Sequence, residues 1–508
     1  MADMTRRTFI RWATALGVST TSGSLLAACG GTVTTGTSSA AAAATSSAVV
    51  ATTAVSSAVP ATTAVSSAAP ATTLATSTAV SSVQTTAVSA APVASQANTT
   101  GAKVTLRYTF DNTPGEATWH KKVNDDYAKL HPEVTLQAEQ ATGDWVTKTV
   151  AQLVSGTGPD IVLGFGATFF QLAATGAFDD LSAPIKQWGA NYDLADIYPE
   201  ALKELQIGGK QYSIPYCFDP VSVFFYLKPV LHDANIPFPN DTWTYDDFQK
   251  DLIALTKQDA SGKTVQWGYN GAESIAGWGY VRTYPAIWAY GGDKYNADMT
   301  HCMLADPEAL KVLDMYYNLK VKDKTSPTAA DSGKLNYYQM FANGQCAMQT
   351  TGPWAIGTYQ NTVKGAILKD NWDVGPPPSG PKGRFILAAG NDWGLNKNGK
   401  NKAAALTLLQ YLTDKDRSKE VGSIARRVPA RLSAGNAFVQ PNTTPTNQTV
   451  FPQSLSYARV ERLHPTQEAK IAEILTTAWN QIIVLNKAAP GQIMPEAVSR
   501  VDALLKQG

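Results

Sequence analysis

Strand and helix patterns alternate over residues 103–166, and this alternation restricts the fold more than any other feature. The strand-type segments are "KVTLRYTF" (103–110), "EVTLQAEQ" (133–140) and "PDIVLGFG" (159–166), and the helix-type segments are "ATWHKKVNDDYAKLHP" (117–132) and "WVTKTVAQLVSG" (145–156). The third strand segment is apolar on both faces, which is typical of a buried parallel strand. The alternation predicts an α/β fold whose ligand crevice lies at the carboxyl ends of the strands.

Residues 103–508 are too many for one hydrophobic core. The segment has about 400 residues, and single cores stop growing below that length, so two lobes are expected. Further segments continue the α/β pattern at 221–228, 245–257, 307–321 and 402–414, and helices are expected near 466–486 and 494–506.

The first 28 residues have the parts of an export signal. Paired arginines at 6 and 7, with Phe9 close behind, precede an apolar run that is too short to span a bilayer. The pair resembles a twin-arginine signal. "LAAC", ending at Cys29, resembles a bacterial lipoprotein box, which implies cleavage before Cys29 and acylation of that residue. We therefore expect residues 1–28 to be removed and Cys29 to be a lipid anchor, the only membrane contact of the chain.

Residues 30–102 differ in composition from the rest of the chain. They contain no Asp, Glu, Lys or Arg, and "ATTAVSSAVP" (51–60) is nearly repeated by "ATTAVSSAAP" (61–70). Small side chains bury too little apolar area to offset the entropy of ordering the chain. We expect residues 29–102 to form a disordered stalk that follows the acylated cysteine.

Signatures of enzymatic or metal chemistry are scarce. The five histidines are scattered without ligand spacing, and the sequence contains no HExxH, paired CxxC or GxSxG motif. A net charge of +1 without basic blocks argues against a nucleic-acid partner. We expect no cofactor and no metal. A pair of carboxylates for glycoside hydrolysis stays open, because many acidic residues are present and none stands out.

Aromatic residues stand next to turn-forming residues at several positions. Trp145 follows "TGD", Trp278 and Tyr280 lie in "AGWGY", Trp354 follows "TGP" and Trp393 follows "AAGND". We expect each at the edge of a helix or strand. Aromatic faces beside Asp and Asn side chains suit a sugar, whose C–H face packs on a ring while its hydroxyls need hydrogen-bond partners. The alternative is that these aromatic residues only pack in the core.

Four stretches carry a resemblance to a known family. They are "SGTGPDIVLGFGATFFQLAATGAFDDL" (155–181), "GGKQYSIPYCFDPVSVFFYLK" (208–228), "WTYDDFQKDLIAL" (243–255) and "MFANGQCAMQTTGPWAIG" (340–357). In this order they resemble the bacterial extracellular solute-binding proteins of family 1, the sugar-binding components of ABC importers, which include maltose-binding protein.

The resemblance implies a two-lobed clamp of type II, like a periplasmic binding protein, with the ligand held between the lobes. The chain would cross between lobes near 214–219, 374–380 and 426–432. Lobe one would comprise 103–215 and 380–427, and lobe two 219–374 and 432–508. The implied ligand-binding residues are Asp111, Asp144, Trp145, Phe165, Asp219, Trp278, Tyr280, Trp354, Asn391, Asp392, Trp393 and Arg427. Ligand identity does not transfer, because Gly164 stands where maltose-binding protein has a tryptophan.

The combined expectation is a monomeric, lipid-anchored protein that captures a sugar and passes it to an ABC permease with its ATPase. It would lie at the outer face of the cell membrane and would have no catalytic activity. One alternative is a secreted, stalk-tethered enzyme that acts on glycosides. A second is a binding protein for another solute, such as a peptide or a polyamine.

Overall fold

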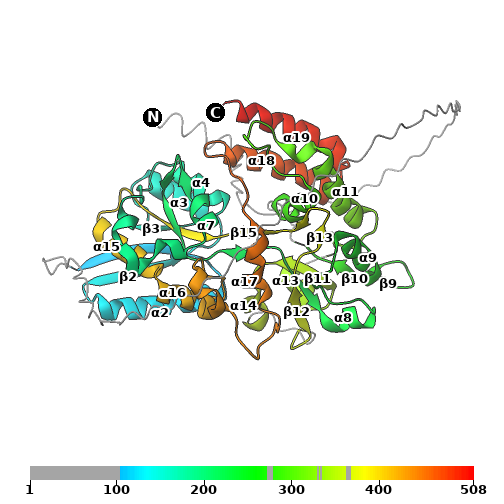
Figure 1. Ribbon diagram of the computed structural model, residues 1–508, viewed down its shortest axis with the longest axis horizontal. Coiled ribbons are helices and arrows are strands. Elements are labelled where there is room, and N and C mark those ends of the chain that lie inside the picture. The colour runs from blue at the N-terminus through cyan, green and yellow to red at the C-terminus, as the bar shows by residue number, and fades with distance from the viewer. Residues whose placement is uncertain (1–102, 272–278, 329–330, 332–334, 362–367, 508) are drawn as a thin grey trace, which may run out of the picture. The chain divides into compact units, whose positions relative to one another are not determined.

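The structure is a computed structural model that describes residues 103–271, 279–328, 331, 335–361 and 368–507. Cys29, the export signal and the stalk segment lie outside these residues. Two five-stranded sheets, each with helices packed on it, make up the main architecture (Figure 1). The α/β expectation is confirmed. Within the described residues, no helix combines the length and apolar character needed to cross a membrane.

The first sheet contains the three strands predicted at the start of the domain. Its order is β2-β1-β3-β16-β6, with β1 Val104–Phe110, β2 Val134–Gln140, β3 Ile161–Phe165, β6 Ser213–Pro215 and β16 Asn391–Leu395. Strand β1 is parallel to β2 and β3, whereas β16 is antiparallel to β3 and β6. Strand β3 is almost wholly buried, as its apolar sequence predicts.

Helices α2 and α3 connect these strands. Helix α2 (Pro114–Leu130) begins with a proline and buries Trp119, Val123 and Tyr127, which are spaced four residues apart along one face. Helix α3 (Trp145–Val154) begins after Asp144, whose carboxylate accepts a hydrogen bond from the Thr147 amide.

The other secondary-structure elements of the first lobe are short or come from later in the chain. They are α4 Ala167–Ala173, α5 Pro184–Gln187, α6 Gly189–Tyr192, α7 Pro199–Glu204, β4 Gln206–Ile207, β5 Lys210–Gln211, α15 Lys402–Leu412 and α16 Lys415–Glu420.

The second sheet has the order β12-β8-β11-β10-β9. Its strands are β8 Val223–Leu227, β9 Lys257–Gln258, β10 Thr264–Tyr269, β11 Cys346–Thr351 and β12 Trp372–Gly375, and the helices around it are α8 Lys228–Asp233, α9 Tyr245–Leu255, α10 Tyr284–Tyr290, α11 Pro307–Val321, α13 Tyr337–Ala342 and α14 Trp354–Asn361. Helix α9 begins with a reciprocal capping box between Thr244 and Asp247.

A small third sheet lies where the chain passes between the two large ones. It has the order β17-β15-β7, with β7 Asp219–Pro220, β15 Ile386–Ala389 and β17 Ala458–Arg459. Strands β6, β7 and β8 follow one another in sequence, so the first passage leads through this sheet. The second passage also includes a hairpin, β13 Ser379–Gly380 with β14 Gly383–Arg384, which packs against α10 of the second lobe. The lobe boundaries stay predictions.

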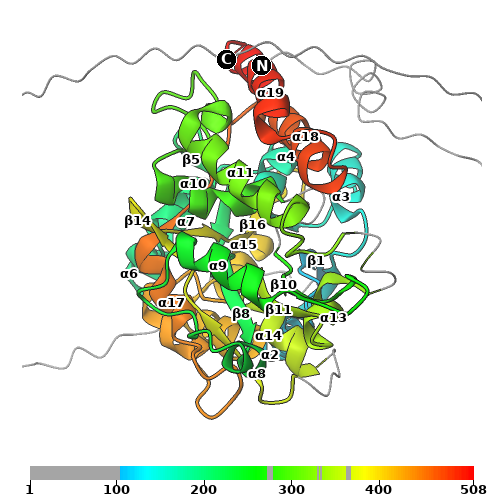
Figure 2. The same cartoon turned by 90° about the vertical axis from the view of Figure 1, so that its right-hand side faces the viewer.

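The C-terminal part of the chain consists of α17 Val450–Ser454, α18 Glu468–Trp479 and α19 Pro490–Leu505. Helices α18 and α19 pack against each other, and α19 packs on α11 of the second lobe. Helix α18 also contacts α4 of the first lobe, and both views show these two helices close together (Figures 1 and 2).

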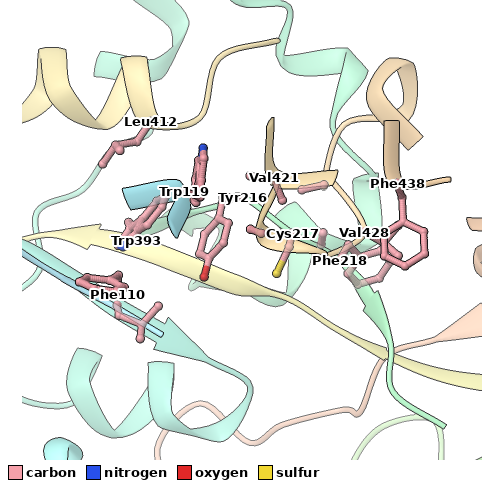
Figure 3. Packing of buried hydrophobic residues seen from close by; sticks show 14 of the residues in the cluster. Phe110, Trp119, Tyr216, Cys217, Phe218, Trp393, Leu412, Val421, Val428 and Phe438 are labelled. Atoms are coloured by element: carbon pink, nitrogen blue, oxygen red, sulfur yellow. The ribbon is translucent and has the colours of Figure 1, made fainter. Parts of the chain in front are cut away.

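One hydrophobic core extends from the first sheet to the second. It includes a group of packed rings, in which Tyr216 stacks on Trp393 at 4.1 Å and Trp119 lies tilted at 6.1 Å from Trp393, measured between ring centroids (Figure 3). The same cluster includes Phe225 of β8 and Val374 of β12. The two lobes therefore share buried apolar surface beside the passages between them.

Candidate functional site

A cavity of about 480 Å³ opens where the first sheet, the second lobe and the passages meet. On the first-lobe side it is lined by Asp111 directly after β1 and by Phe165 at the end of β3. Trp354 at the start of α14 lines the second-lobe side, Asn391 lines the cavity from the start of β16, and Arg427 lines it from the third passage. The crevice thus lies at the carboxyl ends of parallel strands, as the sequence predicts.

Arg427 joins these parts through a buried network of hydrogen bonds. Its Nε donates to Asp219 Oδ2 at 2.6 Å, its Nη1 to Asp111 Oδ2 at 2.9 Å and its Nη2 to Asn391 Oδ1 at 3.0 Å. Asn391 in turn donates from Nδ2 to Asp111 Oδ2 at 2.8 Å. Burial opposes the positive charge, but the carboxylates, Asp219 foremost, raise the pKa of Arg427 well above its ordinary value. One guanidinium therefore ties Asp219, at the first passage, to Asp111 and Asn391 of the first lobe.

Trp354 presents its indole to the cavity in a fixed orientation. Its Nε1 donates to the Tyr338 hydroxyl at 2.9 Å. The guanidinium carbons of Arg427 and Arg282 lie 5.4 Å and 5.8 Å from the ring centroid, within the range of cation–π attraction. On another side the ring lies so close to Gly352 that a Cβ there would overlap it. The site thus combines an aromatic surface with polar groups that are already oriented.

Five of the twelve predicted ligand residues line this cavity: Asp111, Phe165, Trp354, Asn391 and Arg427. Two others lie beside it. Trp145 packs on Phe165 with ring centroids 5.8 Å apart, and Asp144 caps α3. Asp219 does not line the cavity; it is fully buried and pairs with Arg427, which does.

Trp393 and Asp392 do not line the cavity. We expected Trp393 at the edge of an element, but the structure places it inside β16, fully buried, with its Nε1 donating to the Thr109 carbonyl at 2.9 Å. Because side chains alternate across a strand, Asp392 faces the opposite side, where Ser213 Oγ donates to its Oδ1. Tyr280 begins a short 3-10 helix, Tyr280–Thr283. Trp278 lies outside the described residues.

Sequence reasoning did not select fifteen further residues that line the cavity, and four of these carry a charged or phenolic group. They are Glu204, Arg282, Tyr338 and Glu461. Glu204 ends the six-residue helix α7, and Arg282 lies in the 3-10 helix Tyr280–Thr283. Tyr338 lies in α13, and Glu461 lies in the segment before α18. None carries a local motif, and only the fold brings them together.

The described residues include no group of three or more His, Cys, Asp or Glu side chains that could hold a metal ion. Cys217, Cys302 and Cys346 are free and buried. Burial raises the pKa of the Cys302 thiol to about 12 and that of the Cys346 thiol further, so both stay protonated and unreactive at neutral pH.

Comparisons with known proteins point to one family. The family model described as "Bacterial extracellular solute-binding protein" matches residues 111–417. A putative binding protein of Brucella abortus (strain 2308) is 23% identical over 392 residues, which cover 77% of this chain and 90% of that protein. The maltotriose-binding protein of Pyrococcus abyssi is 20% identical over 59% of this chain and 60% of that protein.

Solved structures share the fold. The ABC substrate-binding protein of Listeria monocytogenes in complex with cycloalternan has a TM-score of 0.69 and 21% identity, covering 80% of this chain and 99% of its own. Maltose-bound MalE3 of T. maritima has a TM-score of 0.64 and 19% identity, covering 79% of this chain and 99% of its own. The expected two-lobed architecture is confirmed.

Proposed function

This chain belongs to the family of bacterial extracellular solute-binding proteins, and from that premise we propose that it captures a sugar or oligosaccharide in the cavity described above. The ligand would then be delivered to the permease of an ABC importer, with its ATPase. One observation favours a sugar as the ligand. The Trp354 indole and the hydrogen-bonded network of Asp111, Asn391 and Arg427 line the same cavity.

This pairing suits a carbohydrate for a physical reason. A sugar has an apolar C–H face and a rim of hydroxyls, and burying it is favourable only when both find partners. The indole provides the apolar surface. The carboxylate of Asp111 and the amide of Asn391 are held in place by Arg427 before any ligand arrives, which reduces the ordering cost of binding.

We further propose that the chain acts outside the cell as a monomeric lipoprotein. Residues 1–28 would serve as the export signal, acylated Cys29 as the anchor and the rest of 29–102 as the spacer before the binding domain. The similar proteins reported above are named as binding proteins, and this supports a role in capture rather than catalysis. On this proposal the ligand is released chemically unchanged.

A thermal-shift screen of the full chain tests this function. The panel contains maltose, maltotriose, mannotriose, tagatose and erythritol, together with a tripeptide and spermidine as non-sugar solutes. A solute that binds only the folded protein raises its melting temperature. We expect at least one sugar to do so, and we expect chromatography to recover that sugar intact. A shift with the tripeptide or spermidine alone, or hydrolysis of a sugar, would contradict the proposal.

A Trp354→Ala variant tests whether the sugar occupies this cavity. Loss of an aromatic anchor is worth on the order of 2–4 kcal/mol of binding free energy, which is roughly a 30- to 1000-fold loss of affinity. If the indole instead only packs in the protein, the variant should lose melting temperature and keep its affinity.

A further inference from the structure

Glu204 is a cavity residue whose charge no described side chain balances. It is the last residue of α7 and lines the cavity on the first-lobe side. Within the described part of the chain, no Lys, Arg or His forms an ion pair with its carboxyl, and the charged groups that act on it are two further carboxyls, those of Asp392 and Glu461.

These two carboxyls belong to different parts of the chain. Asp392 lies on β16, where its Oδ1 accepts a hydrogen bond from Ser213 and its buried Oδ2 has no hydrogen-bond partner. Glu461 lies in the segment that precedes α18. This segment packs on the first lobe beside α7, because Leu463 contacts the apolar cluster that contains Leu205.

The cations around the cavity are engaged elsewhere. Lys294 Nζ lies 2.6 Å from Glu461 and 2.8 Å from Glu468. Arg427 is held by Asp219 and Asp111, as described above, and Arg282 donates to the Val221 carbonyl. None of these contacts directs a positive charge at Glu204.

Of these three carboxyls, Glu461 pairs with Lys294, whereas Glu204 and Asp392 have no cation partner among the described side chains. Two such carboxyls near each other do not both ionise readily, because their repulsion favours a retained proton. A neutral carboxyl can donate a hydrogen bond, whereas a carboxylate can only accept. We propose that Glu204 carries the retained proton and donates a hydrogen bond to a hydroxyl of a neutral sugar. This inference rests on the proposed function. Glu204 would then be a specificity-determining residue, and sugar capture would depend on proton concentration.

The electrostatics agree with this role. Burial raises the pKa of Glu204 to about 8, and the nearby Asp392 and Glu461 carboxyls raise it further in the same direction. With that pKa the protonated fraction falls from roughly 0.9 at pH 7 to roughly 0.1 at pH 9. If only the protonated form captures the sugar, the apparent affinity falls by the same factor of about ten.

The test compares the full chain with Glu204→Gln, because a glutamine amide donates like a protonated carboxyl but does not titrate. The probe is the sugar of the panel that gives the largest thermal shift, titrated by calorimetry at pH 7 and pH 9. The parent should bind about tenfold more weakly at pH 9, whereas the affinity of E204Q should change less than twofold. The matched control is Glu200→Gln, an exposed residue of the same helix, which should keep the tenfold change.

Several results would overturn the inference. If the parent binds the sugar equally well at pH 7 and pH 9, the inference is wrong but the proposed function stands. The same holds if E204Q shows the full tenfold pH dependence. Tighter binding of glucosamine than of glucose, lost in E204Q, would show instead that Glu204 is a carboxylate that pairs with a ligand cation.

A measurement without ligand tests the proton itself. Because the folded-state pKa of Glu204 lies above its unfolded value, the folded protein retains a proton that the unfolded chain loses, and stability falls as pH rises from about 4.5 to 8. The melting temperature of E204Q should therefore fall less than that of the parent between pH 6 and 9. Equal falls would contradict the inference even if no sugar of the panel binds.

Discussion

Adding a single methyl group at Gly352 should displace the Trp354 indole and weaken sugar binding. A Cβ at this position would lie 2.6 Å from Cε3 of the indole and closer still to Cζ3 and Cη2. Carbon atoms in favourable contact are about 3.5–4.0 Å apart, so the ring must retreat by about 1 Å or more. The backbone of Gly352 is outside the left-handed region, and steric displacement is therefore the main effect of Gly352→Ala.

The structure sets the size of this effect. A ring displaced by about 1 Å loses its optimal contact with the sugar and stretches the 2.9 Å hydrogen bond from Trp354 Nε1 to the Tyr338 hydroxyl. Part of the 2–4 kcal/mol expected for complete loss of the anchor is forfeited, about 1–2 kcal/mol, which is roughly a 5- to 30-fold loss of affinity. The cost to folding should lie near the lower end of the usual 1–3 kcal/mol for overpacking, about 1 kcal/mol, because the ring can move into the cavity.

Calorimetric titration of four proteins measures this coupling: the parent, G352A, W354A and the double variant. The two substitutions should not be additive, because without the indole the new methyl group has nothing to displace. Gly357→Ala, on α14, is the control, since a Cβ there meets no atom within 4 Å. It should leave affinity unchanged. An additive double variant, or a G352A affinity equal to that of the parent, would refute the role of the indole.

Three further predictions concern the network, a buried carboxyl and the anchor. Arg427→Gln should lower the free energy of unfolding by on the order of 3–5 kcal/mol, because it leaves the buried Asp219 carboxylate without its partner; urea denaturation measures this, and a loss below 1 kcal/mol would contradict it. Burial raises the pKa of Asp392 to about 7, so stability should fall as pH rises from about 4 to 7. Asp392→Asn should flatten this dependence in thermal melts, and an unchanged slope would be evidence against it. Cys29→Ala should shift the exported protein from the membrane fraction to the soluble fraction, or leave it as uncut precursor, whereas normal processing and membrane association would exclude the anchor.

Local sequence patterns predicted the elements whose pairing is also local. Strands β1, β2 and β3 could be predicted because each is a short apolar or alternating run followed by a helix, and such units form parallel sheets. Strand β16 could not. It joins the same sheet from more than 200 residues further along, and "AAGND" just before Trp393 has the composition of a turn. Its place depends on antiparallel pairing with β3 and β6, which no local pattern encodes.

The candidate site shows the same division. The family resemblance implied Asp111 and Phe165, and the structure places them directly after β1 and at the end of β3, whose carboxyl ends meet at one edge of the sheet. Trp354 follows a Gly-Pro turn, which placed it at the start of a helix. Glu204 and Glu461 could not be found, because one ends a short helix and the other lies in an irregular segment. Leu463, near Glu461, packs on the apolar cluster that contains Leu205, the residue after Glu204.

The most direct test of the account is a crystal structure of the full chain bound to the sugar that gives the largest thermal shift. The account predicts one sugar molecule in the cavity, its ring against the Trp354 indole and a hydroxyl within hydrogen-bond distance of Asp111 or Asn391. Density for the sugar outside this cavity, or a sugar whose ring does not contact Trp354, would contradict it.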